Sequence, residues 1–287
     1  MRDPAPLILF LVPELPDPPN KGGSLRAYAV LRRLRRLAPV VVFSLMESPG
    51  EPPAAWQALA QQVHRFPWRP RPLSMRLWQL LASPYPDLAF RYRTPALTRA
   101  LERWVREGRV AAIHIAGLEM AWAVEGLLGR PPGERPALVL DAFNAEYRLQ
   151  ARLFRAGLRH PLRWPGALYS GIQALKLRWY EAAVVRRADH VIAVSGPDAR
   201  DLMALGRAHP PVVASNGVDT AFYRPDATSP LPLGEPAFVF TGSMDYRPNI
   251  DAVCWLAEAV WPRVRAALPE GRLWIVGRRP APAVRAL

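Results

Sequence analysis

The chain has 287 residues, more than one ordinary hydrophobic core holds, and half are hydrophobic, so a soluble protein of two domains is expected. Its single cysteine, Cys254, excludes an internal disulfide, and five scattered histidines give no metal-ligand spacing. The net charge of +14 comes almost wholly from arginine and is spread along the chain. Because no nucleic-acid-binding signature accompanies it, nucleic acid is not expected as a partner. The charge then reflects either a coding bias or attraction to phosphates and acidic lipids.

Residues 7–12 (LILFLV) predict a buried strand. The run is too short to cross a bilayer, and no small-residue cleavage site follows it, so a cytoplasmic location is expected. A proline-rich loop leads to Lys21-Gly22-Gly23-Ser24, which opens a helix before the next strand at 40–43. The helix is expected to bury a stripe that ends at Leu37 and to keep its arginines outside, Arg26 included. The glycine pair predicts either an anion site at the helix N-terminus or a simple turn.

Residues 65–94 mix arginine, proline and aromatic residues. Within them, 73–81 predicts a short amphipathic helix with Arg71 and Arg76 at its polar edge. Two interpretations stay open: a surface that rests on an acidic membrane, or a loop-rich region that packs its aromatics inward. Residues 94–107 then predict a helix with Thr94 as its cap and proline in the first turn.

Polar side chains follow the next two predicted strands. His114 lies near the end of strand 111–115, and Asp141, Asn144 and Glu146 follow strand 137–140. Ligands of open α/β sheets bind at the carboxyl ends of strands, so these residues are candidates for a cleft, although a lone histidine in a strand is more often structural and Asn144 can simply cap a helix. A long helix is predicted at 167–187, with regularly spaced apolar residues at Leu168, Ile172, Leu175, Trp179 and Ala183.

Strand 188–195 ends in a cap at Ser195, and a helix follows it as far as Gly206. Strand 211–214 then leads to Asn216-Gly217, a tight turn. Residues 224–236 are proline-rich without periodicity and predict an interdomain linker.

Residues 238–263 (FVFTGSMDYRPNIDAVCWLAEAVWPR) predict a strand, a small-residue turn and a helix. The strand is expected to be buried on both faces. Asn249 is expected to cap the helix. Pro262 is expected to end or kink it, with the start of a new turn as an alternative. A turn such as Gly242-Ser243 leaves backbone N–H groups free to bind phosphate.

Three segments, ADHVIAVS, ASNGVDTAFYRP and FTGSMDYRPNIDAVCWL, in this order and spacing resemble retaining glycosyltransferases of family four. The resemblance covers nearly the whole chain. It implies an α/β GT-B fold, with two Rossmann-like doubly wound domains facing each other across a cleft. The domains are expected at 1–223 on the acceptor side and 237–287 on the nucleotide-sugar side, with 224–236 as linker. The second is expected to be incomplete, because the family's Glu-x7-Glu segment is not found after Phe238.

The resemblance also implies sugar transfer from a nucleotide-diphosphate donor to a saccharide or lipid-linked acceptor, with retention and without a cofactor or metal. The absence of any Asp-x-Asp pair agrees with this. The GSMDYRPNIDAV segment is most similar to the branch tied to exopolysaccharide and PEP-CTERM export, which implies a cytoplasmic protein peripheral on the inner membrane. Donor diphosphate binding carries over to Lys21, Gly22, Gly23, Gly242, Ser243, Arg247 and Arg278. The cleft is assigned Asp141, Ser195, Asn216 and Gly217, and His114, Asn144 and Glu146 are the catalytic candidates.

The sequence departs from the family in two further ways. Ser243 and the Pro248-Asn249 region replace an arginine and a lysine that grip phosphate, so Arg247, or Arg278 with Arg279, is expected to substitute for them. The family's cleft histidine is expected near Ala116 instead of at His114. Two alternatives therefore remain: a GT-B nucleotide-sugar epimerase, or a non-catalytic fragment that acts as a binding partner.

Overall fold

The computed structural model describes residues 6–17, 22–48, 50–158 and 161–287. The chain forms two compact units, Met1–Gly217 and Val218–Leu287, and each is described by itself. Within the described residues, no helix combines the length and the apolar character needed to cross a membrane.

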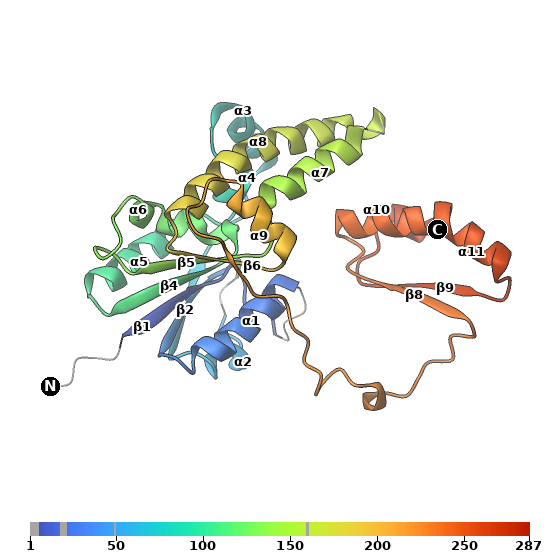
Figure 1. Ribbon diagram of the computed structural model, residues 1–287, viewed down its shortest axis with the longest axis horizontal. Helices are drawn as coiled ribbons and strands as arrows, with labels where there is room; N and C mark the ends of the chain where they lie inside the picture. The colour runs from blue at the N-terminus through green and yellow to red at the C-terminus, as the bar shows by residue number, and fades with distance from the viewer. Residues whose placement is uncertain (1–5, 18–21, 49, 159–160) are drawn as a thin grey trace. The chain divides into compact units, whose positions relative to one another are not determined.

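The first unit is built on a seven-stranded sheet whose order is β3-β2-β1-β4-β5-β6-β7, with every neighbouring pair parallel (Figure 1). The strand order reverses between β1 and β4, which is where open parallel sheets form a crevice at their carboxyl edge. The strands are β1 Leu7–Leu11, β2 Val40–Met46, β3 Gln62–Pro67, β4 Val110–Ala116, β5 Ala137–Ala142, β6 His190–Ala193 and β7 Val212–Val213.

Helices cover both faces of this sheet. Side chains alternate along β1, so that Leu9 and Leu11 join one buried cluster while Phe10 and Val12 join the other. This arrangement confirms the predicted doubly wound, Rossmann-like α/β class. The helical segments are α1 Gly22–Leu34, α2 Ala54–Gln57, α3 Leu73–Ala82, α4 Asp87–Arg91, α5 Pro95–Arg106, η1 Leu118–Val124, α6 Glu125–Leu128, α7 Glu146–Leu158, η2 Pro161–Arg163, α8 Trp164–Arg187 and α9 Gly196–Met203.

Two expectations about helix α1 were wrong. Arg26 is buried, and Leu37 lies beyond the helix and is exposed. In α8, the regularly spaced apolar residues face outward: Leu168, Leu175 and Trp179 are 60%, 65% and 77% exposed. The inward face of α8 includes Gln173 and Glu181, whose carbonyl and carboxylate oxygens accept hydrogen bonds from backbone N–H groups of α4 and α7. These bonds allow polar residues to occupy the buried face.

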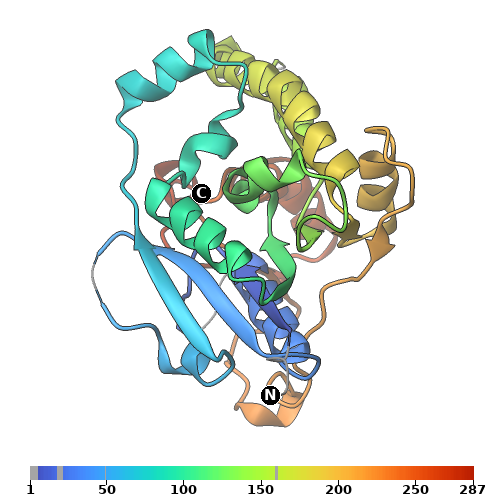
Figure 2. The same cartoon turned by 90° about the vertical axis from the view of Figure 1, so that its left-hand side faces the viewer.

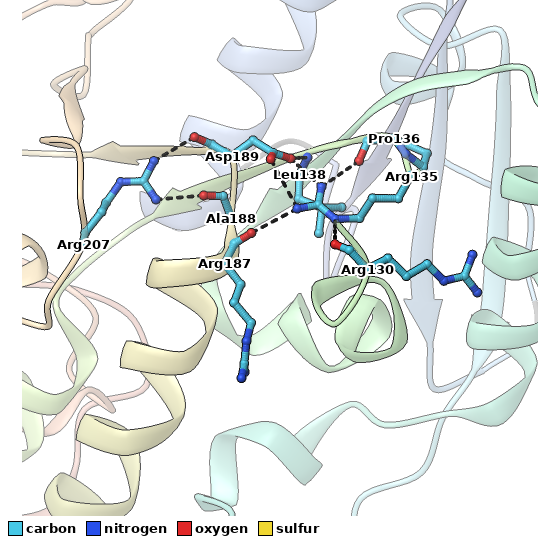
Figure 3. Close-up of polar contacts among 8 residues, drawn as sticks. All are labelled: Arg130, Arg135, Pro136, Leu138, Arg187, Ala188, Asp189 and Arg207. Carbon is cyan, nitrogen blue, oxygen red and sulfur yellow. Dashed lines mark hydrogen bonds and ion pairs between the residues drawn. The ribbon is translucent and has the colours of Figure 1, made fainter. Parts of the chain in front are cut away.

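A network of arginine contacts fixes the amino ends of β5 and β6 (Figure 3). Arg135 donates to both carboxylate oxygens of Asp189, at 2.5 and 3.2 Å, and Asp189 also accepts from Leu138 N at 2.7 Å. Arg207 donates to the carbonyls of Ala188 and Asp189, both at 2.8 Å. Burial opposes the charge of Asp189, but the Arg135 contact outweighs it and lowers the pKa of that carboxyl. This network lies opposite the carboxyl edge and is structural.

The second unit is a βαβ arrangement in which β8 pairs with β9 in parallel, with Phe240 opposite Ile275. Before it, residues 224–236 contain one short helical turn, η3 Pro225–Ala227. The elements of the unit are β8 Ala237–Thr241, α10 Arg247–Trp255, the π-helical segment η4 Leu256–Val260, α11 Trp261–Ala267, β9 Arg272–Val276 and α12 Pro282–Arg285.

Two expectations for this unit need correction, and a third is met. The strand β8 is not buried on both faces, since Val239 is 50% exposed in a sheet of two strands. Tyr246 is the N-cap of α10, while Asn249 lies inside the helix and donates from Nδ2 to Ser243 O at 3.0 Å. Pro262 lies in the first turn of a new helix, α11, as one of the predicted alternatives has it. A π-helical turn precedes it and accommodates its missing N–H.

Candidate functional site

The carboxyl edge of the seven-stranded sheet gathers most of the candidates of the first unit. The start of α1 brings Gly22 and Gly23 there, and β4 and β5 end there at Ala116 and Ala142. Helix α7 begins at Glu146, directly after β5. Because all the strands are parallel, their carboxyl ends share this edge, and the residues that follow them form the candidate site.

Arg26 is the centre of the buried part of this site. Its Nε and Nη2 donate to the Asp141 carboxylate at 2.6–3.0 Å, and its Nη1 donates to Ala214 O at 2.7 Å and Asn216 Oδ1 at 3.0 Å. Burial opposes the charge of Asp141, but the neighbouring His114 ring and the Arg26 guanidinium lower the pKa of Asp141 below its ordinary value. Asp141 therefore stays ionised and holds Arg26 as its counter-ion.

His114 lies beneath the edge and not on its surface. It is 4% exposed and stacks on Phe10, with ring centroids 5.0 Å apart. Its Nε2 lies 3.6 Å from Asp141 Oδ2, longer than a hydrogen bond. In this structure His114 contacts the ion pair and is covered by protein.

Phe143 fills the space between two glycines. A Cβ on Gly23 would lie 3.1 Å from the Phe143 ring, and a Cβ on Gly117 would lie 3.3 Å from the same ring. Gly117 also has φ of +89°, a backbone conformation that favours glycine. In contrast, a Cβ on Gly22 would meet nothing within 4 Å. Gly23 therefore makes room for Phe143, whereas the backbone at Gly22 faces open space.

Two half-buried carboxylates, Glu119 and Glu146, lie at the edge. Glu119 follows β4 in η1, and burial, reinforced by the neighbouring Glu146 carboxylate, raises its pKa to about 7. Burial also raises the pKa of Glu146, whose Oε1 accepts from Asn144 Nδ2 at 3.3 Å. A carboxyl that gains and loses a proton near neutral pH is suited to hold or move the proton of a hydroxyl group.

Two helix N-termini at this edge are closed by side chains. Both carboxylate oxygens of Glu181 accept from the first N–H groups of α7, those of Glu146 and Tyr147, at 3.0 Å each. Burial raises the pKa of Glu181 to about 8, although these two N–H groups lower it. Ser195 is the N-cap of α9 and accepts from Asp198 N at 3.2 Å, which confirms the predicted cap. Gly217 is the last residue of the unit, and a Cβ there would meet nothing within 4 Å.

The predicted phosphate turn of the second unit is shaped by close backbone contacts. A Cβ on Gly277, directly after β9, would lie 1.8 Å from Gly242 O, and a Cβ on Gly242 would lie 2.8 Å from Asn249 Nδ2. Only glycine fits at Gly277, because the carbonyl that it approaches belongs to the turn itself. The ends of β8 and β9 therefore meet at this turn.

Of the basic candidates near this turn, Arg278 lies closest to it. Its Nε donates to Ser243 Oγ at 3.2 Å. Arg247 is the first residue of α10, and Arg279 pairs with Asp245 at 3.7 Å. Lys21 lies outside the described residues.

Sequence reasoning missed Arg26, Glu119, Glu181 and Gly277. Arg26 is one of several arginines in α1, and nothing local distinguishes it from those outside. Glu119 and Glu181 gain their roles only from partners on other elements. For Gly277 a signal was available, because a glycine directly after a predicted strand often marks a close approach of two backbone segments. Among the described residues, no group of three or more His, Cys, Asp or Glu is arranged to hold a metal ion.

The solved structures that are similar to this chain share little sequence identity with it. A UGT transferase from Siraitia grosvenorii in complex with UDP is 13% identical, with 96% of this chain and 66% of that chain covered and a TM-score of 0.45. A putative UDP-N-acetylglucosamine 2-epimerase from Listeria monocytogenes is 10% identical, with 98% and 64% covered and a TM-score of 0.47. The O-GlcNAc transferase of Thermobaculum terrenum is 15% identical, with 95% and 38% covered and a TM-score of 0.43.

The chain thus spans less than two thirds of the length of these proteins. Identities and scores this low say nothing about which sugar or acceptor this chain handles. None of the curated proteins compared with the chain matches it.

A family model gives a direct assignment. The model of Glycosyltransferase Family 4 matches residues 20–222, more than half of the chain and nearly the whole first unit. The match includes the glycine pair of α1, the carboxyl edge of the sheet and the turn at Asn216-Gly217. It agrees with the predicted GT-B class, whose Rossmann-like architecture the parallel sheet displays. The chain belongs to glycosyltransferase family 4.

Proposed function

We propose that the protein transfers a sugar from a nucleotide-diphosphate donor to a saccharide or lipid-linked acceptor, with retention at the anomeric carbon. The family-4 match over residues 20–222 carries this proposal. It is supported by a sheet edge at which a helix N-terminus and carboxylates of raised pKa come together.

The donor diphosphate is contacted by the two glycine turns, each within its own unit. At the first turn, the backbone N–H groups of Gly22 and Gly23 begin a helix and offer donors and a positive dipole end to phosphate. At the second turn, Ser243 and Arg278 lie within hydrogen-bond distance of each other and supply a hydroxyl and a guanidinium. These groups stabilise the negative charge that grows on the leaving diphosphate, so the reaction proceeds without a metal.

The acceptor hydroxyl lies near Asn144 and Glu146 on the exposed edge. With retention, the leaving phosphate itself takes the proton of the acceptor hydroxyl, and the side chains of the edge orient that hydroxyl. Glu119 lies beside Glu146 and joins this group. His114 is covered by protein and supports the edge through Asp141.

The acceptor belongs to exopolysaccharide synthesis at the cytoplasmic face of the inner membrane. The GSMDYRPNIDAV segment supports this narrower assignment through its resemblance to transferases of that branch.

The test is to incubate the intact protein with radiolabelled nucleotide sugars and membrane extract, and to determine the anomeric configuration of the product. Transfer with retention is expected, and Gly22→Val is expected to raise the donor KM because its side chain enters the open space before α1. Conversion of the donor sugar to its epimer in the absence of any acceptor would identify an epimerase instead. The proposal fails if the common donors give neither transfer nor hydrolysis.

A further inference from the structure

Helix α3 presents its apolar side chains to solvent. None of its ten residues is buried. Leu73, Leu77 and Leu81, spaced four residues apart on one face, are 67%, 51% and 83% exposed, and Trp78 beside them is 67% exposed. An exposed stripe of large apolar side chains on a surface helix is the reverse of the arrangement in a soluble domain.

The polar face of α3 is bound to the rest of the first unit. Arg71 and Arg76 both reach Asp87 Oδ1, at 3.0 and 3.3 Å, and Arg71 also donates to Gln79. Lys176 of α8 donates to the carbonyls of Leu80 and Ser83 at 2.6 Å each. These contacts fix the rotation of α3, so its apolar stripe is held outward.

The aromatics of residues 65–94 divide between two environments. Trp68 packs edge-on against Tyr92, and Tyr85 packs against Phe90 and Tyr180. The inward-packing interpretation therefore holds for the segments around α3. Trp78, on α3 itself, points outward.

Helix α8, which lies beside α3 (Figure 2), also presents apolar side chains to solvent. Leu168, Leu175 and Trp179 form the outward stripe of α8. An apolar groove of about 520 Å³ runs between α7 and α8 and is lined by Phe154, Leu168, Leu175 and Arg178, among others. We call this surface, the outward faces of α3, α7 and α8, the apolar face.

The exposed charged residues of α7 and α8 are arginines, of which Arg148 pairs with Asp201 of α9 at 2.9 Å. Arg152, Arg155 and Arg178 are exposed on α7 and α8. The acidic residues of these helices are Glu146, at the candidate site, and Glu181, which is buried. Helix α3 has no acidic residue at all. Exposed apolar side chains next to arginines are suited to a bilayer with anionic headgroups.

We propose that the apolar face rests on an anionic lipid bilayer, with the stripe of α3 and the outer residues of α8 among the acyl chains and the arginines of α7 and α8 at the headgroups. A second copy of the chain is a poorer occupant, because pairing two such faces would bring arginines of like charge together. Lipid binding can be tested apart from sugar transfer, because the stripe of α3 contains no candidate residue of the site.

The test is co-sedimentation of the protein with vesicles of pure phosphatidylcholine and with vesicles that contain phosphatidylglycerol. Binding is expected only to the anionic vesicles and is expected to weaken with salt. The double variant Trp78→Ser/Leu81→Ser is expected to lose about tenfold in affinity, since two exposed apolar side chains no longer insert. Leu37→Ser, an exposed leucine outside the apolar face, is the matched control and should bind normally.

Because all three changed residues are exposed, circular dichroism is expected to show folded variants. Equal binding of the double variant and the parent, or equal binding to neutral and anionic vesicles, would overturn the proposal. The proposal would also be overturned if the protein bound neither kind of vesicle and light scattering showed that it is a dimer. In that case the double variant would be a monomer.

Discussion

Arg26 in α1 holds both carboxylate oxygens of Asp141, 115 residues away at the end of β5, and also reaches Ala214 and Asn216 after β7. Both side chains of the ion pair are nearly fully buried. One guanidinium therefore joins helix α1, the centre of the sheet and the last loop of the first unit.

Arg26→Ala is expected to lower the free energy of unfolding of the first unit by about 3–5 kcal/mol, because it leaves Asp141 buried without its counter-ion. Urea unfolding measures the change. Arg33→Ala, the loss of an exposed arginine from the same helix, is the control and should cost less than about 0.5 kcal/mol. Similar losses for the two variants would show that the buried ion pair has no special role.

The two glycines at the start of α1 are expected to differ. Gly23→Ala places a methyl 3.1 Å from the Phe143 ring and should destabilise the protein by about 1 kcal/mol, with recovery in the double variant Gly23→Ala/Phe143→Leu. Gly22→Ala meets no neighbour and should leave the melting temperature unchanged while raising the donor KM. If Gly22→Ala were as destabilising as Gly23→Ala, the geometry described for Phe143 would be wrong.

Glu119 is expected to make stability depend on pH. Its pKa is about 7 in the folded protein and 4.5 by reference, so the folded state binds the proton more tightly. The contribution of Glu119 to the free energy of unfolding is fully present below pH 4.5 and is lost as pH rises through 7. For this shift the loss amounts to about 3 kcal/mol. Unfolding free energies of the parent and Glu119→Gln should therefore diverge between pH 5 and 8, with the variant more stable at pH 8. Parallel pH curves would contradict this.

Most strands, most helices and the α/β class follow from local patterns, whereas β3 was not predicted. The run at 7–12 is apolar on both faces because two buried clusters take alternate residues of β1. Ser195 and Thr94 are recognisable as caps because the helix start depends on residues within a few positions. The glycine pair likewise marks the turn into α1.

Burial of polar side chains does not follow from such patterns. Arg26 is inside because Asp141, far away in the sequence, is its partner, and the inward face of α8 contains Glu181 because α7 begins beside it. Likewise, the regular spacing of apolar residues in α8 does not show which way they face. Their exposure, with that of the stripe of α3, creates the apolar face.

The arginine network of Figure 3 should be a main source of stability in the first unit. Arg135→Met removes the partner of Asp189 and is expected to cost about 3 kcal/mol or more in unfolding free energy. Arg130→Met is the matched control, because the network uses only the backbone carbonyl of Arg130. Because the Arg135 contact lowers the pKa of Asp189, this stabilisation should be present at neutral pH and be lost on acidification below about pH 4. Arg135 also donates to the backbone carbonyls of Arg130, Pro136 and Arg187, so part of the cost remains at pH 2. A cost of the same size at pH 2 and at pH 7 would rule out the ion pair as its main cause.

Gly277 provides the sharpest test of the turn in the second unit. A methyl there would lie 1.8 Å from Gly242 O, so Gly277→Ala must displace either the end of β9 or the turn that holds Ser243. We expect faster hydrogen exchange across 237–247 and 272–279, and weaker donor binding, while the amides of the first unit exchange as before. Gly126→Ala, where a methyl meets nothing within 4 Å, is the matched control. If Gly277→Ala left exchange in these segments unchanged, the close contact between Gly277 and Gly242 would be refuted, whatever the outcome of the sugar-transfer assay.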